Sequence, residues 1–199
     1  MSLLVKICGL RNEADVNAAA DAGANAVGFV FAKSVRRVSP QDAAAATASM
    51  RNDIRKVAVM RHPSNDEWQN VLLEFRPDVL QTDIVDFASL DVPDTVQCLP
   101  VIREGSPALE GKLPDVFLYE GGNSGQGETV DWQKAAEVAL RGRMLLAGGL
   151  SAENLSEAIT IVRPFGIDVS SAVESEPGVK SHKLIREFID AARAAEQPL

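Results

Sequence analysis

A lysine and a cysteine stand two residues apart in the apolar stretch at residues 4–10, and they are the first candidates for chemistry. The stretch reads Leu-Val-Lys-Ile-Cys-Gly-Leu, which is typical of a short buried strand that ends at a glycine. Because side chains alternate along a strand, Lys6 and Cys8 point the same way. A nearby cation favours the thiolate, the reactive form of cysteine. The alternative is that Cys8 is only a small buried hydrophobe.

Two turns near the other end of the chain have the composition of phosphate-binding loops. Gly148 and Gly149 precede one predicted helix, and Ser170 and Ser171 precede another short segment. Small residues let backbone N–H groups approach a phosphate, and a helix N-terminus adds a favourable dipole. The alternative is that the glycine pair only makes a tight turn. Because both loops agree, the sequence favours a phosphate site.

The elements that must position these residues alternate between strand and helix. Apolar runs bounded by glycine, proline or polar residues predict strands, and segments with good caps predict helices. The predicted strands are 4–10, 26–31, 56–60, 78–82, 96–102, 116–119, 144–147 and 167–170. The predicted helices are 11–22, 41–50, 65–75, 131–140, 152–162 and 181–195, with only a short one near 87–90 and none over 104–112.

Eight such units predict an α/β fold in which a parallel sheet closes into a (β/α)₈ TIM barrel, in one domain over residues 1–199. The length is small for this fold, so we expect two shortened helices. An open flavodoxin-like sheet would need fewer strands. Active sites of barrels lie at the C-terminal strand ends. This rule selects Lys6, Cys8, Arg36, Arg37, Gln81, Thr82, Asp83 and Glu120, together with the two turns.

Composition limits the classes of partner. A net charge of −8 argues against nucleic acid, so an anionic substrate would have to be held locally by arginines or backbone amides. The two cysteines, Cys8 and Cys98, make neither a disulfide framework nor a metal-binding spacing, which favours a reduced, cytoplasmic setting. We expect no signal peptide, no membrane span, no metal and no cofactor.

Several motifs together resemble one family. They are residues 6–10 (Lys-Ile-Cys-Gly-Leu), 28–31 (Gly-Phe-Val-Phe), 34–40 (Ser-Val-Arg-Arg-Val-Ser-Pro), 131–132 (Asp-Trp), 146–150 (Leu-Ala-Gly-Gly-Leu), 168–174 (Asp-Val-Ser-Ser-Ala-Val-Glu) and 178–180 (Gly-Val-Lys). In these segments the chain resembles phosphoribosylanthranilate isomerase, a barrel enzyme of tryptophan synthesis. The resemblance runs from end to end, and the first and the 168–174 motifs together are quite specific.

The resemblance implies a reaction and a role for each matching residue. The family performs an Amadori rearrangement of N-(5′-phosphoribosyl)anthranilate, which needs one proton donor and one proton acceptor. By resemblance, Cys8 is the base, Arg36 contacts the anthranilate end, and the phosphate lies at Gly149 and at Ser170 with Ser171. The family's acid is an aspartate at the end of strand six, a position that Glu120 occupies here.

The chain departs from the family pattern at five places, one of which is Val35, where the family has a proline before Arg36. Glu120 adds a methylene to the usual aspartate, and Asp83 follows Thr82 where the family carries a histidine. The glycine-rich loop is Ser-Gly-Gln-Gly at residues 124–127, and Ala172 replaces a glycine. The acid is therefore assigned less firmly than the base, the arginine and the phosphate loops. Asp168 is a second carboxylate that supports the site or only makes a structural hydrogen bond.

The remaining chemistry-bearing residues are given structural roles. We expect Cys98 in the core, Trp132 in packing, and His62, His182 and Arg37 facing solvent. Two other functions remain open. One is a different phosphosugar barrel enzyme, such as the histidine-pathway aminoaldose isomerase, which uses two aspartates. The other is a barrel that binds a phosphorylated ligand without turnover. The expected partner is a small phosphorylated molecule, and the chain would be a monomer or a homodimer.

Overall fold

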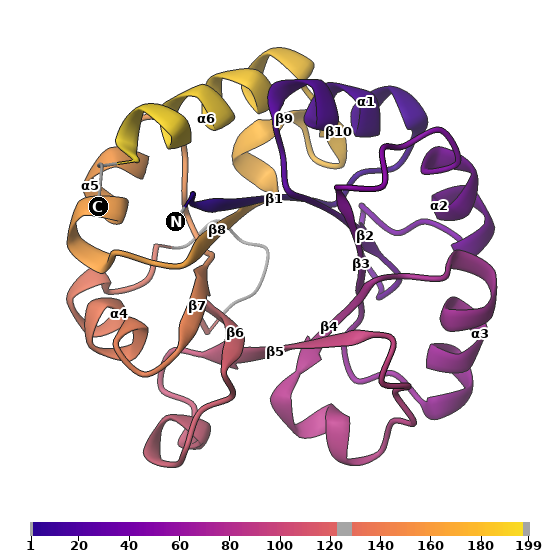
Figure 1. Ribbon diagram of the computed structural model, residues 1–199, viewed down its shortest axis with the longest axis horizontal. Helices are drawn as coiled ribbons and strands as arrows, with labels where there is room; N and C mark the ends of the chain where they lie inside the picture. The colour runs from indigo at the N-terminus through magenta and orange to yellow at the C-terminus, as the bar shows by residue number, and fades with distance from the viewer. Residues whose placement is uncertain (1, 123–128, 197–199) are drawn as a thin grey trace.

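The computed structural model describes residues 2–122 and 129–196. Eight parallel strands pair in sequence order and close into a barrel, with the helices outside it (Figure 1), as the sequence predicts. The strands are β1 (Leu4–Cys8), β2 (Ala26–Val30), β3 (Arg55–Val59), β4 (Val79–Asp83), β5 (Gln97–Arg103), β6 (Val116–Glu120), β7 (Arg143–Leu146) and β8 (Gly166–Val169).

Two of the strand connections lack a full α-helix, which confirms the expected shortening. The turn η1 (Ile84–Ala88) follows β4, and η2 (Pro107–Glu110) follows β5. The α-helices are α1 (Glu13–Ala22), α2 (Pro40–Ala46), α3 (Asn65–Phe75), α4 (Trp132–Ala139), α5 (Leu155–Val162) and α6 (His182–Ala195). Local capping explains several starts. Ser64 makes a capping box with Glu67, for example, and so supplies acceptors for the free N–H groups of the first turn.

Helix α5 begins three residues later than predicted. The expected cap, Ser151, instead donates its backbone N–H to Asn154 Oδ1 at 2.8 Å. The Asn154 side chain also donates to the Gly149 carbonyl at 2.8 Å. Asn154 therefore holds the loop after β7 in place at the start of the helix.

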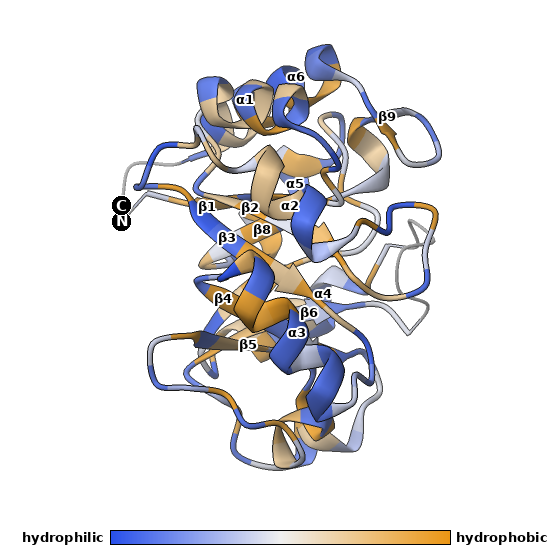
Figure 2. Ribbon diagram, turned by 90° about the vertical axis from the view of Figure 1, so that its right-hand side faces the viewer, coloured by the Kyte–Doolittle hydropathy of each residue, from blue (hydrophilic) through white to orange (hydrophobic). Residues whose placement is uncertain are grey.

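An antiparallel hairpin that the sequence did not predict follows β8. It consists of β9 (Glu174–Glu176) and β10 (Val179–Lys180), after the 3₁₀ turn η3 (Ser171–Val173). Gly178 turns the hairpin with a φ of 84°, and a Cβ there would lie 2.9 Å from the Val35 carbonyl oxygen. The hairpin thus packs closely on the loop after β2. Figure 2 shows β9 projecting from the side of the barrel at which the strands end.

The strand alternation divides the apolar side chains into two layers. One layer lies between the strands and the helices and includes Val5, Ile7, Val27 and Phe29. The other fills the barrel and consists of Ala26, Val57, Val79, Leu99, Val101, Leu118, Leu145 and Ala147. Because alternate residues face opposite sides, Lys6 and Cys8 belong to the inward row.

Cys98 is exposed, so its predicted core position is wrong. It lies one residue after the start of β5, opposite Leu80 of β4. The connection between these strands is the short turn η1 rather than a helix, so less structure is available to cover the outer face of β5 at this position. A strand position alone did not reveal this, because burial depends on what packs over the strand.

No helix within residues 2–122 and 129–196 combines the length and the apolar character that a bilayer crossing requires.

Candidate active site

Lys6 and Asp168 form a buried ion pair at the centre of the site. The two residues are opposite each other in the register of β1 and β8, and Lys6 Nζ lies 2.7 Å from Asp168 Oδ1. The exposed fractions of the two side chains are 1% and 10%. Burial acts to lower the pKa of Lys6, but the charges of Asp168 and Cys8 outweigh it and raise that pKa. Lys6 is therefore held as a cation.

Cys8 lies next to Lys6 over the glycine of the neighbouring strand. A Cβ on Gly28 would lie 3.1 Å from Lys6 Nζ and 3.2 Å from Cys8 Sγ, so a side chain at this position would enter the space that both occupy. Burial raises the pKa of Cys8, Lys6 lowers it, Asp168 raises it and Lys180 lowers it, with a net upward direction. A neighbouring lysine alone predicts the opposite direction, and burial accounts for the difference.

Arg36 is held over the barrel mouth by Glu174 of the hairpin. Its Nε and Nη2 donate to the two Glu174 carboxylate oxygens at 2.7 and 2.9 Å. Burial acts to raise the pKa of Glu174, but hydrogen bonds from Arg36, Lys180 and the Gly178 N–H lower it to about 2. Nη1 of Arg36 makes no hydrogen bond with any residue in the described part of the chain, which leaves this nitrogen for a ligand. Arg37 is exposed, as predicted.

Lys180 is a second buried lysine at the site. Its ammonium donates to Glu174 Oε1 and to the Ser170 carbonyl, both at 2.8 Å, and lies 3.4 Å from Ser170 Oγ. The Ser170 hydroxyl in turn donates to the Cys8 carbonyl at 3.1 Å. The loop after β8 is therefore tied to both β1 and β10.

The two predicted phosphate loops lie side by side, because β7 and β8 are neighbouring parallel strands. Gly148 and Gly149 have φ angles of 91° and 62°. A Cβ on Gly149 would lie 2.7 Å from the backbone nitrogen of Thr129, so this position accepts only glycine without displacement. Ser171 is exposed at the start of η3. The Ser-Gly-Gln-Gly loop at 124–127 lies outside the described residues.

Glu120 lies at the end of β6 on the inward row. Its Oε1 lies 3.1 Å from Arg103 Nη2, at the end of the neighbouring strand β5. Arg103 Nη1 donates to Asp83 Oδ1 at the end of β4. One guanidinium thus bridges the two carboxylates at which the chain departs from the family pattern.

His62 extends this charged network on the rim. Its Nε2 lies 3.2 Å from Asp83 and its Nδ1 lies 2.9 Å from Asp86. His62, Asp83 and Asp86 are the one group in the described residues with three potential ligand atoms within 4.8 Å of one another. Both ring nitrogens already face carboxylates, so the arrangement is that of a hydrogen-bonded network rather than an open metal site.

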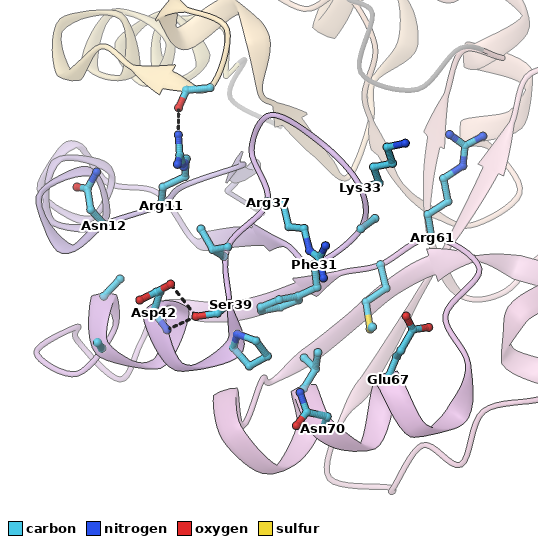
Figure 3. A pocket seen from close by; sticks show the side chains of 18 of the residues that line it. Arg11, Asn12, Phe31, Lys33, Arg37, Ser39, Asp42, Arg61, Glu67 and Asn70 are labelled. Carbon is cyan, nitrogen blue, oxygen red and sulfur yellow. Dashed lines mark hydrogen bonds between the residues drawn. The ribbon is translucent and has the colours of Figure 1, made fainter.

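A large open groove of about 1160 Å³ lies beside the mouth, and Lys180 and His62 line part of it. Arg11, Lys33, Arg37 and Arg61 line it, together with residues of α2 and α3 (Figure 3). Cys8 does not line this groove. The acidic side chains of the groove offset much of the charge of its basic side chains. We therefore locate the candidate chemistry at the barrel mouth, where the buried ionisable groups converge.

Three residues of the site were not assigned roles from the sequence: Arg103, Glu174 and Lys180. Arg103 was missed because the predicted fifth strand ended one residue earlier, at Ile102. Glu174 and Lys180 belong to matching motifs, but their contacts depend on a hairpin with no clear local signal. The signal in the sequence that could have identified Glu174 and Lys180 was that each is a charged residue at the end of a matching motif.

Comparisons with known proteins identify the family of the chain. A family model for N-(5'phosphoribosyl)anthranilate (PRA) isomerase matches residues 5–191. The N-(5'-phosphoribosyl)anthranilate isomerase of Listeria welshimeri is 35% identical, over 98% of this chain and 100% of its own. That of Bradyrhizobium is 38% identical, over 99% and 98%.

Solved structures of isomerases of the same name are also similar to this chain. The Thermotoga maritima phosphoribosyl anthranilate isomerase superposes with a TM-score of 0.86 at 30% identity, over 96% of this chain and 99% of its own. Another structure of an isomerase of this name, in complex with reduced 1-(o-carboxyphenylamino)-1-deoxyribulose 5-phosphate, has a TM-score of 0.83 at 30% identity over the same shares. A further Thermotoga maritima structure, with a TM-score of 0.83 at 29% identity over the same shares, is of monomers generated from the dimeric enzyme. The chain therefore belongs to the phosphoribosylanthranilate isomerase family.

Proposed function

We propose that the chain converts N-(5′-phosphoribosyl)anthranilate to 1-(o-carboxyphenylamino)-1-deoxyribulose 5-phosphate in tryptophan synthesis. The observation that carries this proposal is the position of Cys8 beside Lys6, with the Arg36–Glu174 ion pair at the same mouth. Family membership supports it, as does the complex of a relative with a reduced form of this product.

The reaction needs two proton carriers on different sides of one ribose ring. An acid protonates the ring oxygen, which opens the ring to a Schiff base, and a base then removes the C2′ proton. The resulting enolamine tautomerises to the ketone. We assign the base to Cys8 on β1 and the acid to Glu120 on β6. Two strands, β7 and β8, separate them around the barrel, which supports positions across the mouth from each other.

The remaining residues would bind the two ends of the substrate. Arg36, with Nη1 available, would contact the anthranilate end. Backbone amides near Gly148, Gly149, Ser170 and Ser171 would hold the phosphate, as the adjacent loops after β7 and β8 do in many barrels. Lys6 and Asp168 would support the ring between the two ends, within reach of Cys8.

The proposed partner is this phosphorylated small molecule, with no role for nucleic acid. A cytoplasmic location is part of the proposal, because Cys8 must stay reduced to accept a proton. The dimeric relative makes a homodimer one expected assembly and a monomer the other. Light scattering of the purified protein distinguishes them.

The experiment is a turnover assay of the purified protein with phosphoribosylanthranilate and, separately, with the histidine-pathway aminoaldose. We expect turnover of the first alone. Cys8→Ala should lower kcat by about 10²–10⁴-fold, the usual contribution of a positioned proton carrier, with KM little changed. Binding without turnover by the unmodified protein would instead establish a non-catalytic binder.

A further inference from the structure

Five charged side chains from five different elements lie at the mouth, and four of them, Lys6, Asp168, Lys180 and Arg36, interact electrostatically with Cys8. Lys6 lies on β1, Asp168 on β8, Arg36 in the loop after β2, Glu174 on β9 and Lys180 on β10. All five side chains are at most 13% exposed. At such burial their charges are poorly screened by water, so the balance of the whole group decides the protonation of the thiol.

Lys6 is the cation that lowers the pKa of Cys8 most, but its own charge is balanced by Asp168. Its ammonium lies 2.7 Å from Asp168, and the two side chains are buried together. The positive charge lowers the pKa of Cys8, but the negative charge of Asp168 acts in the opposite direction. The pair therefore presents Cys8 with a dipole rather than a net cation.

Lys180 differs, because its carboxylate partner is shared. Glu174 already gives both of its oxygens to the guanidinium of Arg36, at 2.7 and 2.9 Å. The other two contacts of the Lys180 ammonium are the neutral carbonyl and hydroxyl oxygens of Ser170. The same hydroxyl donates to the backbone carbonyl of Cys8, so the ammonium is fixed to the strand that carries the thiol.

Three cations and two carboxylates thus surround one buried thiol. One positive charge remains unbalanced, and an ionised Cys8 is the group that would balance it. We propose that Lys180, held between Glu174 and Ser170, is the positioning residue whose charge stabilises the Cys8 thiolate. This inference rests on the proposed function for its catalytic meaning, but the thiolate itself is measured without substrate.

The test is an ultraviolet titration of the Cys8 thiolate in a Cys98→Ser background, which removes the exposed second thiol. The same protein with Cys8→Ala supplies the baseline. Lys180→Gln keeps a hydrogen-bond donor and removes the charge. It should move the thiolate midpoint upward by about one pH unit, because a nearby opposite charge is lost. The limb of the kcat/KM profile that reports Cys8 should move upward with it, and Lys180→Arg should restore both.

In a second variant we expect the thiolate midpoint to move in the opposite direction. Glu174→Gln removes a negative charge from the same cluster, so the thiolate midpoint should move downward. Lys183→Met is the matched control: this lysine is 83% exposed and pairs with Glu187 on the surface of α6, so its loss should change neither measurement.

An unchanged midpoint in Lys180→Gln, with activity lowered equally at every pH, would show a purely structural role and overturn the inference. So would midpoints that move in the same direction in Lys180→Gln and Glu174→Gln. If Cys8→Ala retains full activity while the midpoints move as expected, the proposed base is wrong, but the assignment of Lys180 to the thiolate stands.

Discussion

Arg103 lies 3.1 Å from Glu120, so the group proposed as the general acid faces a guanidinium. A nearby cation favours the ionised form of a carboxyl group, whereas an acid must be protonated before it donates. Arg103 also donates to Asp83, which competes for the same positive charge. The effect of Arg103 on Glu120 is therefore reduced by Asp83, at the position where the family carries a histidine.

Replacing Glu120 by glutamine should remove the acid while preserving the size of the side chain. We expect Glu120→Gln to lower kcat by about 10²–10⁴-fold, with competition by inorganic phosphate unchanged. Steady-state kinetics with and without phosphate measures both effects. Glu104→Gln, at the end of the neighbouring strand and paired with Lys134, is the control and should retain kcat. Normal turnover by Glu120→Gln would move the donor role to Asp168 or Asp83.

Removing the guanidinium should let Glu120 keep its proton at a higher pH. Without Arg103, a nearby cation no longer favours the carboxylate, so the limb of the kcat profile that reports Glu120 should move upward in Arg103→Met. The limb that reports Cys8 should stay in place, which separates the acid from the base. A downward shift of the Glu120 limb would contradict an acid at this position.

A side chain at Gly149 should damage the phosphate loop. Gly149→Ala places a Cβ at a φ of 62° and 2.7 Å from the Thr129 nitrogen, so the loop must shift. We expect KM and the inhibition constant of inorganic phosphate to rise about tenfold or more, which corresponds to about 1.4 kcal/mol.

Gly23→Ala is the matched control for backbone strain. Gly23 has a φ of 98°, and a Cβ there would meet nothing within 4 Å. It lies at the end of α1 before β2, away from the mouth. This variant should lower stability without changing the phosphate affinity. Equal losses of phosphate affinity in both variants would argue against the phosphate loop at Gly149.

Glu174 should make the protein sensitive to acid. Its pKa in the folded protein is about 2, below the ordinary value of 4.5, so its carboxylate contributes stability that is present above about pH 4.5 and is lost as the pH falls toward 2. In Glu174→Gln, the free energy of unfolding should change less between pH 5 and 3 than in the unmodified protein. Urea unfolding at several pH values measures it, and identical slopes would contradict the assignment.

The order of residues by itself determined the barrel and one half of the site. Strand period and cap residues are local properties, so the eight strands, the two shortened connections and the shared direction of Lys6 and Cys8 followed from neighbours in sequence. The motifs around Gly149 and Ser170 also marked the loops that the closed sheet brings side by side.

Only the tertiary structure decided which charges balance each other. Asp168 neutralises Lys6 from a strand 162 residues away in sequence, and Glu174 reaches Arg36 across 138 residues. Such pairs form where closure of the barrel brings strand ends together in a region that excludes water. Neither the meeting of the strand ends nor the exclusion of water can be predicted from a short stretch of sequence. Burial, which is also a tertiary property, reversed the direction expected for the pKa of Cys8. The structure that packs over a strand is another such property, and Cys98 is exposed where the sequence predicted a core position.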